Sequence, residues 1–179
     1  MYQFINGVSS LLFIISTIKA FISSDLILWK LSNSVLIISS HLCNAYSFEK
    51  YLLFDYMMIY LTCLSYLNNS TLNSVLVLSG IYEYINKESI EITKNITFTL
   101  TLLKSITCTY IYINNQFFFI IVGVSSMGVI VYKIRYSLYL IDPRKTWYMT
   151  WIWHLCVTTI LYISSITANY GECSFLKDS

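Results

Sequence analysis

Two histidines and one aspartate are the side chains of this chain with the clearest capacity for chemistry. His41 and His154 are its only histidines, and Asp55 lies among large apolar residues. Imidazole nitrogens and carboxylate oxygens bind metal ions, and they also exchange protons in general acid–base reactions. Because a bound metal can activate water, these residues could support hydrolysis if the fold brings them together.

The composition around these residues predicts an integral membrane protein. The chain has 179 residues, of which 56% are hydrophobic and only 11% are charged. Soluble domains usually carry about 25% charged residues, so this chain has too little polar surface to cover a water-soluble globule. The net charge of +2, with no basic stripe, argues against a nucleic-acid partner. The five cysteines have no CxxC pairing and are expected to be small buried apolar residues.

Charge-poor windows predict an all-α, multi-pass membrane protein with seven transmembrane helices in one domain. A spanning helix needs roughly 17–25 mostly apolar residues. The expected spans are residues 4–21, 26–43, 51–67, 72–85, 96–113, 117–132 and 147–166. The first window has no basic stretch before it and no small-residue cleavage site, so we expect an uncleaved span and not a signal peptide.

The distribution of basic residues predicts that the N-terminus faces the cytoplasm, because cytoplasmic loops carry an excess of lysine and arginine. With seven spans, the N-terminus and the loops after spans two, four and six share one side. That side holds Lys50, Lys87, Lys94, Lys133, Arg135, Arg144 and Lys145. The other side holds Lys19, Lys30, Lys177 and the glycosylation sequons at Asn68 and Asn69.

The predicted spans place His41, Asp55 and His154 at a similar depth near the cytoplasmic face. An ionisable residue inside a span costs on the order of a few kcal/mol, so such residues suggest a function. A metal or acid–base site is one interpretation. Hydrogen bonds that only hold the helices together are the other. Lys104, in the middle of span five, is expected to pair with a carboxylate or a backbone carbonyl inside the bundle.

Short stretches around these three residues resemble one family of membrane enzymes. The stretch from Ser40 to Cys43 is similar to a His-x-Cys motif, and the run from Glu49 to Tyr56 is similar to a Glu-Lys…Leu-Asp-Tyr stretch. The run from Trp147 to Leu155 is similar to a Tyr-x-His-Ser-Ile-Trp-His motif. With their order on spans two, three and seven, they resemble the CREST superfamily of seven-span membrane hydrolases, and within it the transmembrane-8/myomaker group.

The resemblance implies zinc-dependent hydrolysis of lipid amides or esters. Members with the full motif hold zinc by three histidines, with an aspartate and a serine near the metal-bound water. His41 and His154 match two of these metal ligands, and Asp55 matches the carboxylate that orients the water. Zinc lowers the pKa of such a water to about 7 and so generates the nucleophile.

Two positions depart from the pattern that the resemblance implies. Thr150 stands where the family has its third histidine, and Ile37 stands where it has the serine. Ser34, Ser39 or Ser40 could stand in for that serine, although only Ser34 is expected on a nearby face of the helix. Asp55 or Cys43 could complete a three-ligand metal site.

The sequence therefore leaves two functions open. One is a membrane-lipid amidase or esterase with an altered zinc site. The alternative is a non-catalytic structural, interaction or receptor-like membrane protein with the same fold. A small transporter would need a polar path through both faces, which Lys104 and Glu83 alone do not supply.

Overall fold

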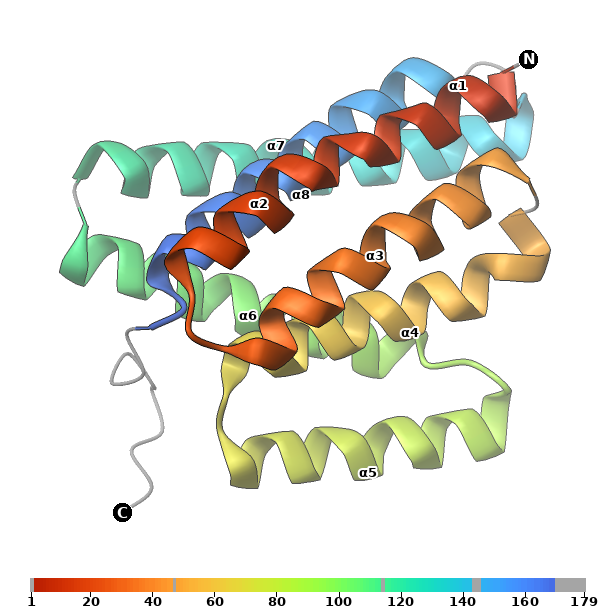
Figure 1. Cartoon of the computed structure of the whole chain (residues 1–179). Coiled ribbons are helices and arrows are strands. Elements are labelled where there is room, and N and C mark those ends of the chain that lie inside the picture. Colours follow the sequence, from red (N-terminus) through yellow and green to blue (C-terminus); the bar gives the residue numbers. More distant parts are fainter. Residues whose placement is uncertain (1, 47, 114, 143–145, 170–179) are drawn as a thin grey trace.

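The computed structural model describes residues 2–46, 48–113, 115–142 and 146–169, and helices make up almost all of this part of the chain (Figure 1). In chain order the elements are α1 (Tyr2–Ser9), the 3₁₀ turn η1 (Ser10–Leu12), α2 (Phe13–Ser23), α3 (Ile27–Ala45), α4 (Phe48–Leu67), α5 (Ser70–Lys87), α6 (Glu91–Tyr112), α7 (Asn115–Ile141) and α8 (Trp147–Thr167). The described residues contain no strand, so the all-α prediction is confirmed.

The first three elements form one continuous rod, so the described chain contains seven helical rods. Each rod overlaps one of the seven segments that the sequence predicts, with ends that differ by a few residues. The largest difference is in α7, which runs to Ile141 while the predicted segment ends at residue 132. The helix continues through residues 133–141 although this stretch is more polar. Charged residues end the apolar window used for the prediction, but they do not interrupt the backbone hydrogen bonds of a helix.

The rods lie side by side in two tilted layers with α5 at one edge (Figure 1). The α1–α2 rod packs against α3 and α8, and α7 packs against α8. Helix α3 pairs with α4, while α6 contacts α4, α7 and α8. Helix α5 lies at the outside, against α6, and keeps most of its apolar side chains exposed.

The apolar core is divided into two clusters of buried side chains. The larger cluster joins α2, α3, α4 and α8 and contains Phe13, Ala20, Trp29, Leu36, Met58, Tyr66, Leu161 and Ala168. The smaller cluster joins α4, α5 and the start of α6 and contains Tyr60, Leu64, Leu67, Leu76 and Ile90. The two clusters meet on α4, which therefore connects the peripheral α5 to the rest of the bundle.

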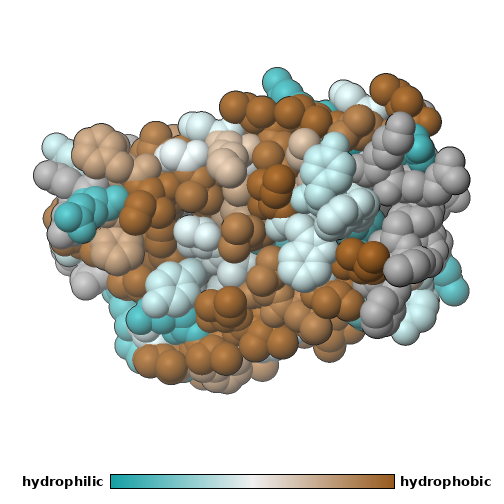
Figure 2. All heavy atoms as spheres, turned by 90° about the horizontal axis from the view of Figure 1, so that it is seen from above, coloured by the Kyte–Doolittle hydropathy of each residue, from teal (hydrophilic) through white to brown (hydrophobic). Residues whose placement is uncertain are grey.

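Many small polar side chains are buried beside this apolar core, while many large apolar side chains are exposed. Helix α6 buries Thr93, Lys94, Thr97, Thr101, Lys104, Ser105 and Thr109, and α8 buries Thr150, His154, Thr158, Ser164, Ser165 and Thr167. On the outside, Ile22 is 75% exposed, Ile85 74% and Phe119 70%. Figure 2 shows apolar residues over most of the middle of one face. Exposed large apolar side chains together with buried small polar ones are typical of a helix bundle whose surroundings are apolar.

Three rods are long and apolar enough to cross a membrane, judged by length and composition. They cover Ile5–Ser23, Gln116–Arg135 and Trp147–Thr167. The structure thus supports three of the seven predicted spans on this criterion. The other four rods carry more hydroxyl, amide and charged side chains, which lower their mean hydropathy; in α3 and α6 many of these side chains are buried.

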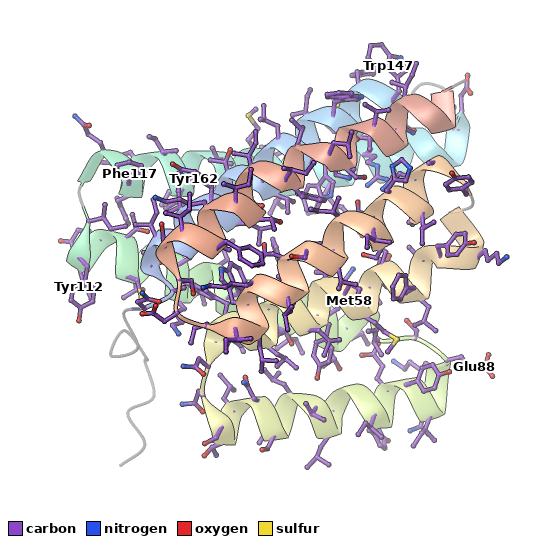
Figure 3. The ribbon with its side chains drawn as sticks, in the orientation of Figure 1. Met58, Glu88, Tyr112, Phe117, Trp147 and Tyr162 are labelled. Atoms are coloured by element: carbon purple, nitrogen blue, oxygen red, sulfur yellow. The ribbon has the colours of Figure 1, made fainter. Side chains whose placement is uncertain are left out.

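The connections between helices alternate between two ends of the bundle. Glu88, between α5 and α6, and Trp147, at the start of α8, lie at one end, and Tyr112 and Phe117 lie at the other (Figure 3). We call the first the histidine end, because α3 finishes there and α8 begins there, near His41 and His154.

Candidate functional site

Three consecutive residues of α3 reach three different neighbours at the histidine end. The Ser39 hydroxyl donates to Asp55 Oδ1 of α4 at 3.1 Å, and Ser40 Oγ lies 3.5 Å from His154 Nε2 of α8. His41 Nδ1 lies 2.9 Å from the carbonyl oxygen of Gly7 in α1. Because a helix turns by about 100° per residue, three successive side chains point toward different helices.

His154 is the most enclosed of the predicted site residues. Its side chain is only 2% exposed, and its Nδ1 lies 2.6 Å from the hydroxyl oxygen of Ser9 in α1. Ser9 donates its own proton to the Asn6 carbonyl at 2.5 Å, so its oxygen accepts from the Nδ1–H group of His154. A neutral imidazole protonated on Nδ1 has its acceptor lone pair on Nε2, which is the atom that faces Ser40.

The Ser40 hydroxyl oxygen accepts hydrogen bonds from two side chains. Ser10 donates to it at 3.1 Å and the Asn44 amide at 3.3 Å. The carbonyl of the Asn44 side chain accepts from Arg135 at 3.1 Å, which fixes the amide with its nitrogen toward Ser40. We call Ser9, Ser10, Ser40, Asn44 and His154 the histidine cluster. It joins α1, α3 and α8, with α7 attached through Arg135.

Asp55 lies beside the histidine cluster and not inside it. Its described hydrogen-bond partner is Ser39, and the positive charges of Arg135 and Lys94 act on its carboxylate. The Lys94 ammonium lies 3.5 Å from the centroid of the Tyr56 ring, a cation–π arrangement that keeps this buried charge next to α4. Asp55 therefore contributes to electrostatic contacts among α3, α4, α6 and α7.

Glycine is required where His41 meets α1. A Cβ atom added at Gly7 would overlap Ala45 Cβ and would lie 3.2 Å from His41 Cε1. The absence of a side chain lets α1 and α3 approach closely, and this approach brings the Gly7 carbonyl within reach of the His41 ring. The position of His41 thus depends on Gly7 and Ala45.

The described residues do not gather a metal site. No three of their His, Cys, Asp and Glu side chains lie close enough to hold an ion. Nδ1 of His41 faces the Gly7 carbonyl, and the two ring nitrogens of His154 face Ser9 and Ser40. The zinc site stays a prediction that rests on the resemblance alone, and we derive no chemical step through it.

The structure also places Thr150 and the serines of α3, which the sequence analysis considered in place of missing family residues. Thr150 is fully buried and donates to the Thr146 carbonyl at 3.0 Å, one turn back in the chain. Of the three serines that could stand in for the missing one, Ser34 donates to the Lys30 carbonyl of its own helix at 2.9 Å, Ser39 donates to Asp55, and Ser40 lies beside His154. Ser40 is the serine of α3 that lies beside His154. It points into the bundle, whereas the next residue, His41, points toward α1.

The prediction for Lys104 is confirmed. Its ammonium donates to the backbone carbonyls of Tyr66 at 3.0 Å and Leu67 at 2.9 Å, at the C-terminus of α4. The cysteine prediction is also confirmed for the four described cysteines, which are all buried. Cys173 lies outside the described residues.

Asn44 and the pair Ser9 and Ser10 are the members of the histidine cluster that the sequence analysis missed. The two serines lie in the first apolar window, where short hydroxyl side chains do not interrupt an apolar pattern. The adjacent Ser9-Ser10 pair at the point where α1 passes into η1 is the signal that could have found them, since 3₁₀ turns within helices often mark functional positions.

Comparisons with protein-family models, with curated proteins and with solved structures found no match to this chain.

Proposed function

We propose that this chain is a multi-pass integral membrane protein in which all seven rods cross the bilayer with the N-terminus in the cytoplasm. Its role is structural or in interactions within the membrane. The observation that supports this role is that His41, Asp55 and His154 each engage a neighbouring helix through a hydroxyl or carbonyl group and not one another.

Helix length supports seven crossings. The shortest rod, α5, has 18 residues and the longest single helix, α7, has 27. A hydrocarbon core of about 30 Å needs about 20 helical residues. The charged residues that lower the hydropathy of α5 and α6 have partners inside the protein, because Glu83 accepts from backbone N–H groups of Ile92 and Thr93 and Lys104 binds carbonyls.

The exposed apolar side chains support membrane lipids as the surroundings of the bundle. Exposed leucine, isoleucine and phenylalanine side chains occur on every rod from α2 to α8. Such a surface in water would be an extensive aggregation-prone patch, whereas acyl chains cover it without cost.

A cysteine-labelling experiment tests the number of crossings. Seven spans place position 88 in the cytoplasm and position 112 outside it, whereas three spans place both positions on one side. We would introduce Glu88→Cys or Tyr112→Cys into a Cys173→Ser background, in which the four remaining cysteines are buried. Both target side chains are exposed.

With seven spans, a membrane-impermeant maleimide labels Tyr112→Cys in intact cells and labels Glu88→Cys only after permeabilisation. Labelling of both positions, or of neither, in intact cells would contradict seven crossings. Metal analysis of the purified protein tests the zinc alternative. One zinc per chain, lost in both His41→Ala and His154→Ala, would favour the metal-dependent hydrolase over the proposed role.

A further inference from the structure

Helices α3 and α8 face each other through two buried stripes with the same residue spacing. Ser40 lies beside His154 at the histidine end, and the Trp29 indole N–H donates to Ser165 at 3.1 Å further along. The two helices run in opposite directions, and the two intervals contain the same number of residues. Residues three or four apart share one face of a helix, so two middle layers of buried side chains follow: Leu36 with Thr158, and Asn33 with Leu161.

Each middle layer contains a polar atom that needs a further partner. Asn33 Oδ1 and Thr158 Oγ1 are buried and have no hydrogen-bond partner among the described residues. The Asn33 amide nitrogen donates to the Trp29 carbonyl at 2.8 Å, so the amide oxygen is the atom that requires a donor. Thr158 differs from other hydroxyl residues of α8 that donate to their own helix, namely Thr150, Thr159, Ser165 and Thr167. Because a buried polar atom without a hydrogen bond costs free energy, both atoms indicate a bound ligand.

A third atom of this kind lies nearer the histidine end. Asn6 Oδ1 is buried and has no partner in the described part of the chain. The Ser10 hydroxyl donates to Ser40, which places these two residues at one level. At a rise of about 1.5 Å per residue, Asn6 lies about 6 Å nearer the histidine end than Ser10, and Asn33 lies about 10 Å deeper than Ser40. The three atoms therefore extend over about half of a hydrocarbon core of about 30 Å.

We propose that a file of water molecules enters the bundle at Asn6, passes His154 and Thr158, and ends at Asn33. The file gives His154 a path for proton exchange with the solution at the histidine end. This path goes beyond the structural role. It depends neither on the number of rods that cross the membrane nor on which side faces the cytoplasm.

Water is the ligand that suits these groups. The Asn33 oxygen only accepts hydrogen bonds, while the Thr158 hydroxyl both donates and accepts, and one water molecule can serve both. The four side chains of the middle layers carry no charge, so a neutral ligand is favoured over an ion. In the end layers the long rings of His154 and Trp29 reach short serines, whereas the middle layers hold shorter side chains. We therefore expect room for water there, and buried water typically bonds about three such groups.

Trp29 closes the path beyond Asn33. Its side chain is fully buried, and its ring lies 5.1 Å from that of Tyr66, measured between centroids. The indole N–H donates to Ser165 and the indole accepts no proton, so it cannot pass one on. Proton exchange is therefore confined to the histidine end. A hydronium ion in the file gives a proton to His154 and the imidazolium returns one to water, with no net charge moved across the bundle.

Water-edited solid-state NMR tests the path on the whole protein in lipid bilayers, because magnetisation passes from water to the side chains it contacts. With labelled asparagine, threonine and histidine, we expect transfer as fast as that to the exposed Asn86 at four residues: Asn6, His154, Thr158 and Asn33. Thr97 is the dry control. It is fully buried, donates to the Thr93 carbonyl at 2.7 Å, and lies nearer to an end of its helix than Thr158 does. Transfer to Thr158 and Asn33 as slow as to Thr97, or no fast transfer to Asn6 or His154, would overturn the proposal.

Thr158→Val tests whether the sites are connected, because valine keeps the shape of threonine and lacks the hydroxyl. We expect this variant to lose the fast transfer to Asn33 and to keep it at Asn6. Thr97→Val is the matched control and should change neither. Circular dichroism establishes that each variant is folded, and the comparison of Thr158 with Thr97 in the unaltered chain needs no variant. Unchanged transfer to Asn33 in a folded Thr158→Val chain would overturn a continuous file.

Discussion

Two buried ionisable residues, His154 and Lys104, show opposite ways of placing a polar group inside a helix bundle. Lys104 donates to two backbone carbonyls at 3.0 and 2.9 Å, which are not part of the helical hydrogen-bond ladder because α4 ends there. His154 meets side-chain hydroxyls, and its contact with Ser40 is longer at 3.5 Å. The lysine contacts fix a helix end, whereas the histidine contacts leave a basic nitrogen beside a hydroxyl. An ionisable residue inside a bundle is therefore evidence of function only when its partners are themselves reactive groups.

Glu83 strengthens this comparison because it mirrors Lys104. Its carboxylate accepts from the backbone N–H groups of Ile92 and Thr93 at 2.9 and 2.8 Å, at the N-terminus of α6. An acid at a helix N-terminus and a base at a helix C-terminus both complement the helix dipole. Two of the buried charges thus cap helices, and neither has an arrangement suited to catalysis.

The largest expected effect is on stability when the lysine contacts are removed. Lys104→Met keeps most of the side-chain volume but leaves the carbonyls of Tyr66 and Leu67 without their donor. Each unsatisfied buried group costs about 1–3 kcal/mol, so we expect a loss of about 2–4 kcal/mol in the free energy of unfolding. Urea or thermal unfolding in detergent measures it.

Lys87→Met is the matched control, because Lys87 is exposed and its loss should change stability by less than about 0.5 kcal/mol. If Lys104→Met were as stable as Lys87→Met, the role of Lys104 at the end of α4 would be wrong.

A smaller effect is expected where the histidine end depends on close helix packing. Gly7→Ala introduces a Cβ that overlaps Ala45, so α1 must move away from α3 and His41 loses the Gly7 carbonyl. Overpacking of this kind costs about 1–3 kcal/mol. Gly123→Ala is the control, because a Cβ at Gly123 meets nothing within 4 Å and the change should be neutral or slightly stabilising. Equal unfolding temperatures for the two variants would contradict the close α1–α3 contact.

The sequence predicted the elements of this fold better than the contacts of its site. Apolar windows located all seven rods, because burial and lipid exposure both select apolar residues over the length of a helix. His41 and His154 lie at a similar depth because α3 ends and α8 begins at the same end of the bundle. The order and direction of the helices were enough to predict this. Which residue each ring meets depends on rotation about the helix axis and on the Gly7–Ala45 approach. Neither is encoded in local periodicity, so the sequence alone could not decide which of Ser34, Ser39 and Ser40 lies beside His154.

The smallest expected stability effects come from two matched hydroxyl deletions, and they separate the two kinds of polar contact most directly. Ser9 and Ser164 are both fully buried and both lie in interhelical hydrogen bonds, Ser9 with His154 at 2.6 Å and Ser164 with Ser105 at 2.9 Å. Interhelical hydrogen bonds in membrane proteins contribute about 0.6 kcal/mol on average, so Ser9→Ala and Ser164→Ala should destabilise the chain by similar small amounts. Only Ser9→Ala removes the acceptor that keeps the proton of His154 on Nδ1. It should therefore change the ring-nitrogen chemical shifts of His154, measured by NMR on protein with labelled histidine, while Ser164→Ala leaves them unchanged. If both variants gave the same His154 shifts as the unaltered chain, Ser9 would not set the tautomer of this ring, because a hydroxyl that only holds two helices together affects stability without affecting where the imidazole proton sits.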